Sequence, residues 1–119
     1  MTLEQFLTKV RQNESVSFQE TMAIITENYR YQPVGFSNGM GEDRIVNAAG
    51  TNEGSCKIFA FAKLNQLNEQ QTLKLFGDYY RKDVLANPGG TDHQNIRHFM
   101  KYGWEGIQYD RLALRNLHI

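Results

Sequence analysis

Asn47-Ala-Ala-Gly-Thr-Asn-Glu-Gly-Ser-Cys-Lys57 runs directly into Ile58-Phe-Ala-Phe-Ala-Lys-Leu64. The first segment is dense in Asn, Gly and other polar residues, whereas the second places apolar side chains on nearly every side of a helix. A helix that is apolar all round is normally buried on all sides. We therefore expect a buried central helix over residues 54–66, with a polar and flexible corner at its amino end.

Four amphipathic helices are predicted to surround the central one. Each begins with a capping-box spacing, in which the cap side chain and the third residue satisfy each other's free N–H groups. The four pairs are Thr2/Gln5, Ser17/Glu20, Asn68/Gln71 and Thr91/Gln94. The apolar stripes that follow keep the 3.6-residue period of a helix, as in Leu73, Phe76, Tyr80 and Val84. Asn87-Pro88-Gly89-Gly90 has strong turn chemistry and separates the last two helices.

Residues 31–52 lack a helical period and are rich in Gly and Asn, which predicts a short hairpin around Asn38-Gly39. Ile107 and Tyr109 alternate with polar residues, which suits a strand near the end of the chain. The predicted fold class is mainly α with minor α+β character. It has five helices, one buried at the centre, and a two- or three-stranded β element from the Gly-rich loop and the C-terminal tail. We expect one domain over residues 1–119.

The composition excludes several classes of function. Thirteen basic residues balance thirteen acidic ones, so no positive surplus supports generic nucleic-acid binding. The single cysteine cannot form an internal disulfide, which fits a reducing compartment. No apolar run approaches the ~20 residues that span a bilayer. The start of the chain lacks the features of a secretory signal. We therefore expect a soluble cytoplasmic protein with no membrane association.

Cys56 is the candidate nucleophile. In the first turn of the central helix, the helix dipole and Lys57 would both favour its thiolate. His93, preceded by Asp92, is a candidate base for a cysteine–histidine pair, and Glu53 is a third candidate catalytic residue. The alternative reading of Cys56 is a buried small hydrophobe. No catalytic signature is complete, so the sequence leans away from an enzyme.

A ligand site is expected where the polar corner meets the central helix, because free N–H groups at a helix start can hold an anionic group. The candidate ligand-binding residues are Asn38, Asn47, Asn52, Glu53, Ser55, Cys56, Lys57, Tyr80, Arg81, Asp92, His93 and Arg97. The asparagines also have a structural reading, since Asn stabilises irregular backbone by local hydrogen bonds. No metal-ligand spacing is present, so neither a metal nor a cofactor is predicted.

Four motifs resemble the HopJ type III effector protein family. They are Phe36-x-Asn38-Gly39, Gly50-x-Asn52-Glu53-Gly54-Ser55-Cys56-Lys57, Phe76-Gly77-x-Tyr79-Tyr80-Arg81-x-Asp83-Val84-Leu85, and Asp92-His93-x-Asn95-Ile96-Arg97-x-Phe99-Met100-x-x-Gly103-Trp104. The resemblance spans roughly residues 1 to 112. It implies a bacterial protein, and the family's name implies type III export. A capped helix starting at Thr2 favours retention in the cytoplasm instead, because type III signals are usually disordered.

Two hypotheses about function follow. The resemblance implies a protein-interaction or regulatory module with a protein partner, and it brings no reaction, cofactor or catalytic residue with it. The polar corner instead favours a binder of a small molecule or anion, or a thiol-dependent enzyme, that uses the helix start at Asn52–Lys57.

Overall fold

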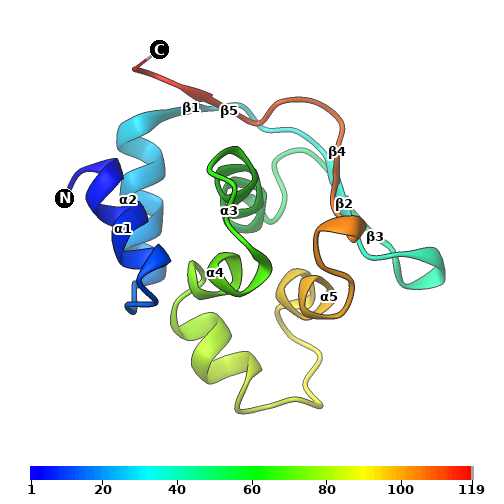
Figure 1. Ribbon diagram of the computed structural model, residues 1–119. Helices are drawn as coiled ribbons and strands as arrows, with labels where there is room; N and C mark the ends of the chain where they lie inside the picture. The colour runs from blue at the N-terminus through cyan, green and yellow to red at the C-terminus, as the bar shows by residue number, and fades with distance from the viewer. Residues whose placement is uncertain (119) are drawn as a thin grey trace.

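The computed structural model describes residues 1–118, which form a mainly helical fold with two small β-sheets (Figure 1). The α-helices are α1 (Leu3–Arg11), α2 (Phe18–Asn28), α3 (Glu53–Leu64), α4 (Glu69–Lys74) and α5 (Gln94–Tyr102). A π-helix, η2, spans Tyr79–Val84, and two 3₁₀ turns are η1 (Gly41–Asp43) and η3 (Gly103–Gly106). The predicted class, mainly helical with a minor β element, is confirmed. No helix within residues 1–118 is both long and apolar enough to cross a bilayer.

Each sheet uses one strand from the last part of the chain. The predicted hairpin is present as β2 (Phe36–Asn38) and β3 (Ile45–Asn47), which pair antiparallel. β4 (Gln108–Tyr109) adds to the other edge of β2. The second sheet pairs β1 (Tyr29–Tyr31) antiparallel with β5 (Leu114–Asn116). The segment after α5 therefore pairs with β1 and β2, which lie close together in the sequence but far earlier in the chain.

Phe59 of α3 is the centre of an aromatic cluster in the core. Six residues of α3 are buried, namely Cys56, Ile58, Phe59, Ala60, Phe61 and Ala62. Helix α3 lies between α2 and the β2–β3 hairpin (Figure 1). The Phe59 ring centroid is 4.8 Å from that of Phe99, 5.5 Å from Phe76, 6.1 Å from Phe36 and 6.4 Å from Trp104. One side chain thus joins the hairpin, the segment after α4, and α5 with the turn that follows it.

The stripe from Leu73 to Val84 does not form one helix, although its spacing predicts one. Helix α4 ends at Lys74, and the chain resumes as the π-helix η2 after Gly77. Gly77 has φ +62°, and a Cβ there would lie 2.6 Å from the backbone nitrogen of Phe18. The chain can therefore pass this close to the start of α2 only at a residue without a side chain.

The predicted caps are correct for three helices and wrong for the fourth. Thr2, Ser17 and Asn68 each form a complete capping box at the start of α1, α2 and α4. Helix α5 begins after His93 instead of Thr91, because His93 takes the left-handed conformation at φ +49°. The Gln94 side chain donates to the Thr91 carbonyl at 2.6 Å and so does not reach back to a cap N–H.

Candidate functional site

A pocket of about 460 Å³ is bordered by the first turns of both α3 and α5, and we call it the α3–α5 pocket. Its polar lining consists of Asn52, Gly54, Ser55, His93, Gln94 and Asn95. Its apolar lining consists of Phe18, Ile45, Phe76, Tyr79 and Ile96. The volume lies within the roughly 300–1,000 Å³ of small-molecule sites, and the mixed lining is also typical of them.

The two helices that border the pocket differ from the others at their starts. Neither Asn52 of α3 nor His93 of α5 caps its helix with its side chain, and both take left-handed backbone conformations. The first helical hydrogen bonds are Cys56 N–H to Asn52 O at 3.0 Å and Arg97 N–H to His93 O at 3.1 Å. The N–H groups before them have no acceptor in their own helix. Two helix ends with partial positive charge thus border one pocket.

A cluster of buried asparagine side chains fixes the relative position of these helix starts. Asn95 donates to Asn47 Oδ1 at 2.9 Å and accepts from Asn47 and Asn38, each at 3.1 Å. Asn52 donates to the same Asn47 oxygen at 2.7 Å. Asn38 also donates to the Asn95 carbonyl at 2.8 Å. The β2–β3 hairpin is therefore tied by hydrogen bonds to the amino ends of α3 and α5.

Asn95→Ala is expected to lower the free energy of unfolding by about 2–3 kcal/mol. The change removes three side-chain hydrogen bonds and leaves the buried Asn47 amide nitrogen with only a 3.4 Å bond to the Phe36 carbonyl. A poorly satisfied buried polar group costs about 1–3 kcal/mol. Urea denaturation followed by circular dichroism measures the loss. Asn87→Ala is the matched control, because Asn87 is exposed and the change is expected to stay within about 0.5 kcal/mol. Equal losses in the two variants would contradict a structural role for the cluster.

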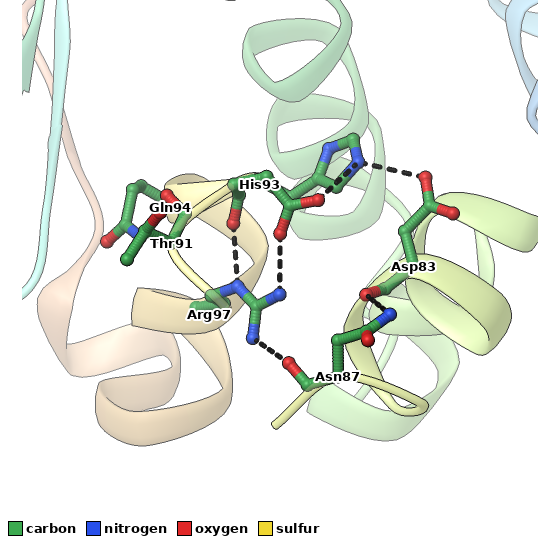
Figure 2. Close-up of polar contacts among 7 residues, drawn as sticks. Asp83, Asn87, Thr91, His93, Gln94 and Arg97 are labelled. Carbon is green, nitrogen blue, oxygen red and sulfur yellow. Dashed lines mark hydrogen bonds and ion pairs between the residues drawn. The ribbon is translucent and has the colours of Figure 1, made fainter. Parts of the chain in front are cut away.

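His93 is held at the rim of the pocket by two carboxylates and a tyrosine ring. Figure 2 shows its imidazole facing Asp83, with Nε2 at 3.0 Å from Asp83 Oδ2. Asp92 Oδ2 lies 3.8 Å from the same nitrogen, and the Tyr79 ring centroid lies 5.2 Å from the imidazole. The imidazole is thus fixed between the π-helix η2 and the start of α5.

Arg97 fixes the turn that carries His93 (Figure 2). Its guanidinium donates to the Asp92 carbonyl and to Asp92 Oδ1, both at 2.6 Å, and to the Asn87 carbonyl at 2.8 Å. The hydrogen bond from Arg97 lowers the pKa of the Asp92 carboxyl below its usual value. Asp92 and Arg97 therefore hold the backbone in place, and neither lines the pocket.

Cys56 lies in the core, where it is 1% exposed, and its Sγ is 3.8 Å from the Val34 carbonyl oxygen. Burial raises the pKa of the Cys56 thiol, which is the opposite of what a reactive thiolate needs. The polar contacts of the His93 imidazole within residues 1–118 are with Asp83 and Asp92. The structure thus fits the reading of Cys56 as a buried hydrophobe.

Native protein is expected to react with iodoacetamide about tenfold or more slowly than urea-unfolded protein, because the Cys56 thiol is buried. Its labelling midpoint is expected above the ~8.5 of free cysteine, since the shift is upward. Mass spectrometry across pH gives both quantities. Cys56→Ala combined with Ser55→Cys is the matched control, because it moves the thiol one residue along α3 into the pocket lining. Fast native labelling at Cys56 with a midpoint below pH 8 would contradict a buried thiol and would support a catalytic role for Cys56.

The other residues expected at the site lie outside the pocket lining. Tyr80 is buried in the core. Arg81 donates to the Val16 carbonyl at 3.2 Å and pairs with Asp78. The Lys57 ammonium lies 4.6 Å from the centre of the Tyr31 ring. Glu53 is an exposed first-turn residue of α3. Within residues 1–118, no group of three or more His, Cys, Asp or Glu side chains is placed to hold a metal ion.

Three residues predicted from the sequence, Asn52, Ser55 and His93, line the pocket, and Asn38 and Asn47 support it. The N–H of Gly54, also expected from the sequence to hold an anion, lies in the lining as well. The lining residues that were not predicted as ligand-binding are Phe18, Ile45, Phe76, Tyr79, Gln94, Asn95 and Ile96. Phe18, Phe76 and Ile96 match the periodic pattern of core positions, so their spacing carried no sign that they border a cavity. Asn95 was detectable only as a polar residue next to the expected start of a helix.

Comparison with known proteins gives one family and one structural relative. The HopJ type III effector protein family matches residues 3–114. A solved crystal structure, of a protein described as unknown function protein VPA0580, is 49% identical in sequence. The match covers 98% of this chain and 94% of that chain, with a TM-score of 0.92. The comparison with curated proteins found no match.

Proposed function

This chain belongs to the HopJ type III effector protein family, and we propose that it is a binding protein whose α3–α5 pocket takes up a small molecule. The observation that carries the proposal is that two helix starts without side-chain caps border one pocket of about 460 Å³. Helices α1, α2 and α4 instead begin with capping boxes, in which the cap side chain accepts from the third N–H of the helix. An acceptor from a ligand would satisfy the free N–H groups in α3 and α5.

The lining of the pocket defines the chemical class of the ligand. N–H groups at the starts of α3 and α5 favour a carboxylate, a phosphoryl group or another oxygen acceptor. Phe18 and Tyr79 pack edge to face with ring centroids 5.0 Å apart, and Phe76 and Ile96 add apolar surface. A compound that joins an aromatic or apolar body to one anionic group matches both walls.

Phenyl phosphate is a suitable probe in a titration followed by ¹H–¹⁵N NMR. We expect the amide signals of Gly54, Ser55, Asn95 and Ile96 to shift in a saturable way. Phenol lacks the anion and inorganic phosphate lacks the ring, so each alone is expected to give weaker shifts. Shifts that are scattered over the surface, or centred away from the pocket, would overturn the proposal.

Two leucine variants test whether the response comes from the pocket. Ser55→Leu fills the cavity from its lining and is expected to abolish the shifts. Ser15→Leu makes the same chemical change at an exposed residue outside the lining and is expected to leave them intact. Retention of the shifts in Ser55→Leu would place the bound probe elsewhere.

A second candidate function is a protein-interaction or regulatory module, in keeping with the effector name of the family. The observation that favours it is a pair of exposed leucines away from the pocket, Leu64 at 47% and Leu112 at 53%. Exposed apolar side chains that share one groove are typical of interaction sites. In an NMR titration a protein partner would perturb amides around these leucines, whereas a small ligand would perturb those of the α3–α5 pocket.

A further inference from the structure

An apolar groove of about 260 Å³ lies where the end of α3 meets the connection between β4 and β5. Leu64 and Leu112 line it, and Lys63 and Arg111 border it. A second pocket of about 290 Å³ is lined by Arg30 and Arg115 and shares Leu112 and Ala113 with the first. The two form one continuous surface, which we call the basic groove and define by Arg30, Lys63, Leu64, Arg111, Leu112 and Arg115.

Two arginines in the basic groove face each other across the β1–β5 sheet. Arg30 and Arg115 are direct partners in the antiparallel register. Residues in this arrangement have Cβ atoms about 5 Å apart, and like charges placed so are destabilising. Both side chains are exposed and both line the same pocket. The pairing therefore destabilises the β1–β5 sheet, and a bound anion would reduce the repulsion between the two arginines.

No carboxylate within residues 1–118 lies within 4.0 Å of the cationic groups of Arg30, Lys63, Arg111 or Arg115. Lys9, Arg97 and Lys101 do have such partners, in Glu20, Asp92 and Asp43. Within residues 1–118, Arg11, Arg44, Lys57 and Lys74 have none either, so what distinguishes the basic groove is that four such cations lie around one surface. The formal net charge of the chain is zero, so the excess of positive charge is local to this face. Charge complementarity points to an acidic partner.

We propose that the basic groove binds a segment of a partner protein in which Asp or Glu side chains alternate with leucine-like side chains. The apolar side chains of that segment fill the groove beside Leu64 and Leu112. Its carboxylates accept hydrogen bonds from Arg30 and Arg115, whose planar guanidinium groups suit bidentate pairing. The proposal rests on the second candidate function, and it involves no residue that lines the α3–α5 pocket.

A fluorescein-labelled synthetic peptide of about fifteen residues with alternating Glu and Leu is the probe, and fluorescence anisotropy measures its binding. We expect saturable binding that weakens as salt rises, because the contacts are charged and exposed. A peptide with Ser in place of Leu, and one with Lys in place of Glu, are both expected to bind at least tenfold more weakly. Failure of the first peptide to bind, or equal binding of the Ser peptide, would overturn the proposal.

Arg30→Glu separates binding from folding. The change puts Glu opposite Arg115, so we expect the thermal midpoint to stay level or rise while peptide affinity falls about tenfold. Arg44→Glu is the matched control, because Arg44 is also exposed but lies outside the basic groove and is expected to keep the affinity within twofold. Unchanged affinity in Arg30→Glu would overturn the assignment of the surface.

Three further measurements exclude other occupants of the groove. Light scattering of the free protein tests whether a second copy of the chain occupies the groove. A dimer that Arg30→Glu converts to monomers would overturn the proposed acidic partner. Phosphatidylserine vesicles and single-stranded DNA test for other polyanions, and tighter binding of either than of the peptide would overturn the proposal. Ser55→Leu is expected to leave peptide binding unchanged. The peptide and phenyl phosphate experiments can thus fail independently.

Discussion

Phe59→Ala is expected to lower the free energy of unfolding by about 3–5 kcal/mol, the range for removing a large aromatic side chain from a core. Phe59 is fully buried, and its ring contacts those of Phe36, Phe76, Phe99 and Trp104. These residues come from three separate segments, so no single movement can fill the resulting cavity. The free energy of unfolding of native domains is only about 5–15 kcal/mol, so this loss removes a large part of the stability of the protein. The midpoint of urea denaturation measures the change.

Two controls separate the cavity from the loss of an aromatic ring. Phe59→Leu keeps most of the volume and is expected to cost about 1–1.5 kcal/mol. Phe18→Ala removes a half-buried ring at the edge of the α3–α5 pocket and is expected to cost less than half as much as Phe59→Ala. A loss in Phe59→Ala no larger than that in Phe18→Ala would show that the core does not depend on the cluster.

Gly77→Ala is expected to lower the free energy of unfolding by about 3 kcal/mol. A left-handed backbone costs a residue with a Cβ roughly 1–2 kcal/mol, and Gly77 has φ +62°. The added Cβ would also lie 2.6 Å from the Phe18 backbone nitrogen and 3.2 Å from the Ser17 carbonyl carbon. Backbone atoms at the start of a capped helix cannot move aside cheaply, so the two costs add. Thermal and urea denaturation both report the result.

Gly89→Ala is the matched control for the glycine substitution. A Cβ at Gly89 meets no atom within 4 Å, and its backbone is not in the left-handed region. Alanine there restricts the unfolded chain and is expected to leave stability unchanged or raise it by about 0.4–1 kcal/mol. Similar losses in Gly77→Ala and Gly89→Ala would mean that the close approach at Phe18 does not matter.

Local rules predicted those parts of the fold that depend on near neighbours in the sequence. Capping boxes at Thr2, Ser17 and Asn68 close within four residues, and all three form. The hairpin around Asn38-Gly39 also joins near neighbours, since its outermost pair is Phe36 with Asn47. The break at Gly77 was missed, because it depends on the approach of α2, and the spacing of apolar residues carries no information about that approach.

The site was only partly predictable for a similar reason. Polar residues beside a helix start suggested Asn52, Ser55 and His93, which line the pocket. The direction of the Cys56 side chain depends on its packing against the Val34 segment. The same local pattern therefore predicted Cys56 as a site residue, although its thiol is buried. Asn95 gains its importance from contacts with Asn38 and Asn47, which lie about fifty residues earlier in the chain.

The strands β4 and β5 make trimming of this end of the chain unusually costly. Ends of domains generally tolerate shortening when few contacts hold them. Here Tyr109 stacks on Phe36 with ring centroids 5.2 Å apart, and Leu114 is buried beside the strand that follows α2. Proteolytic cleavage just before Gln108 would therefore remove a strand from both sheets in a single event and expose core side chains at two distant points.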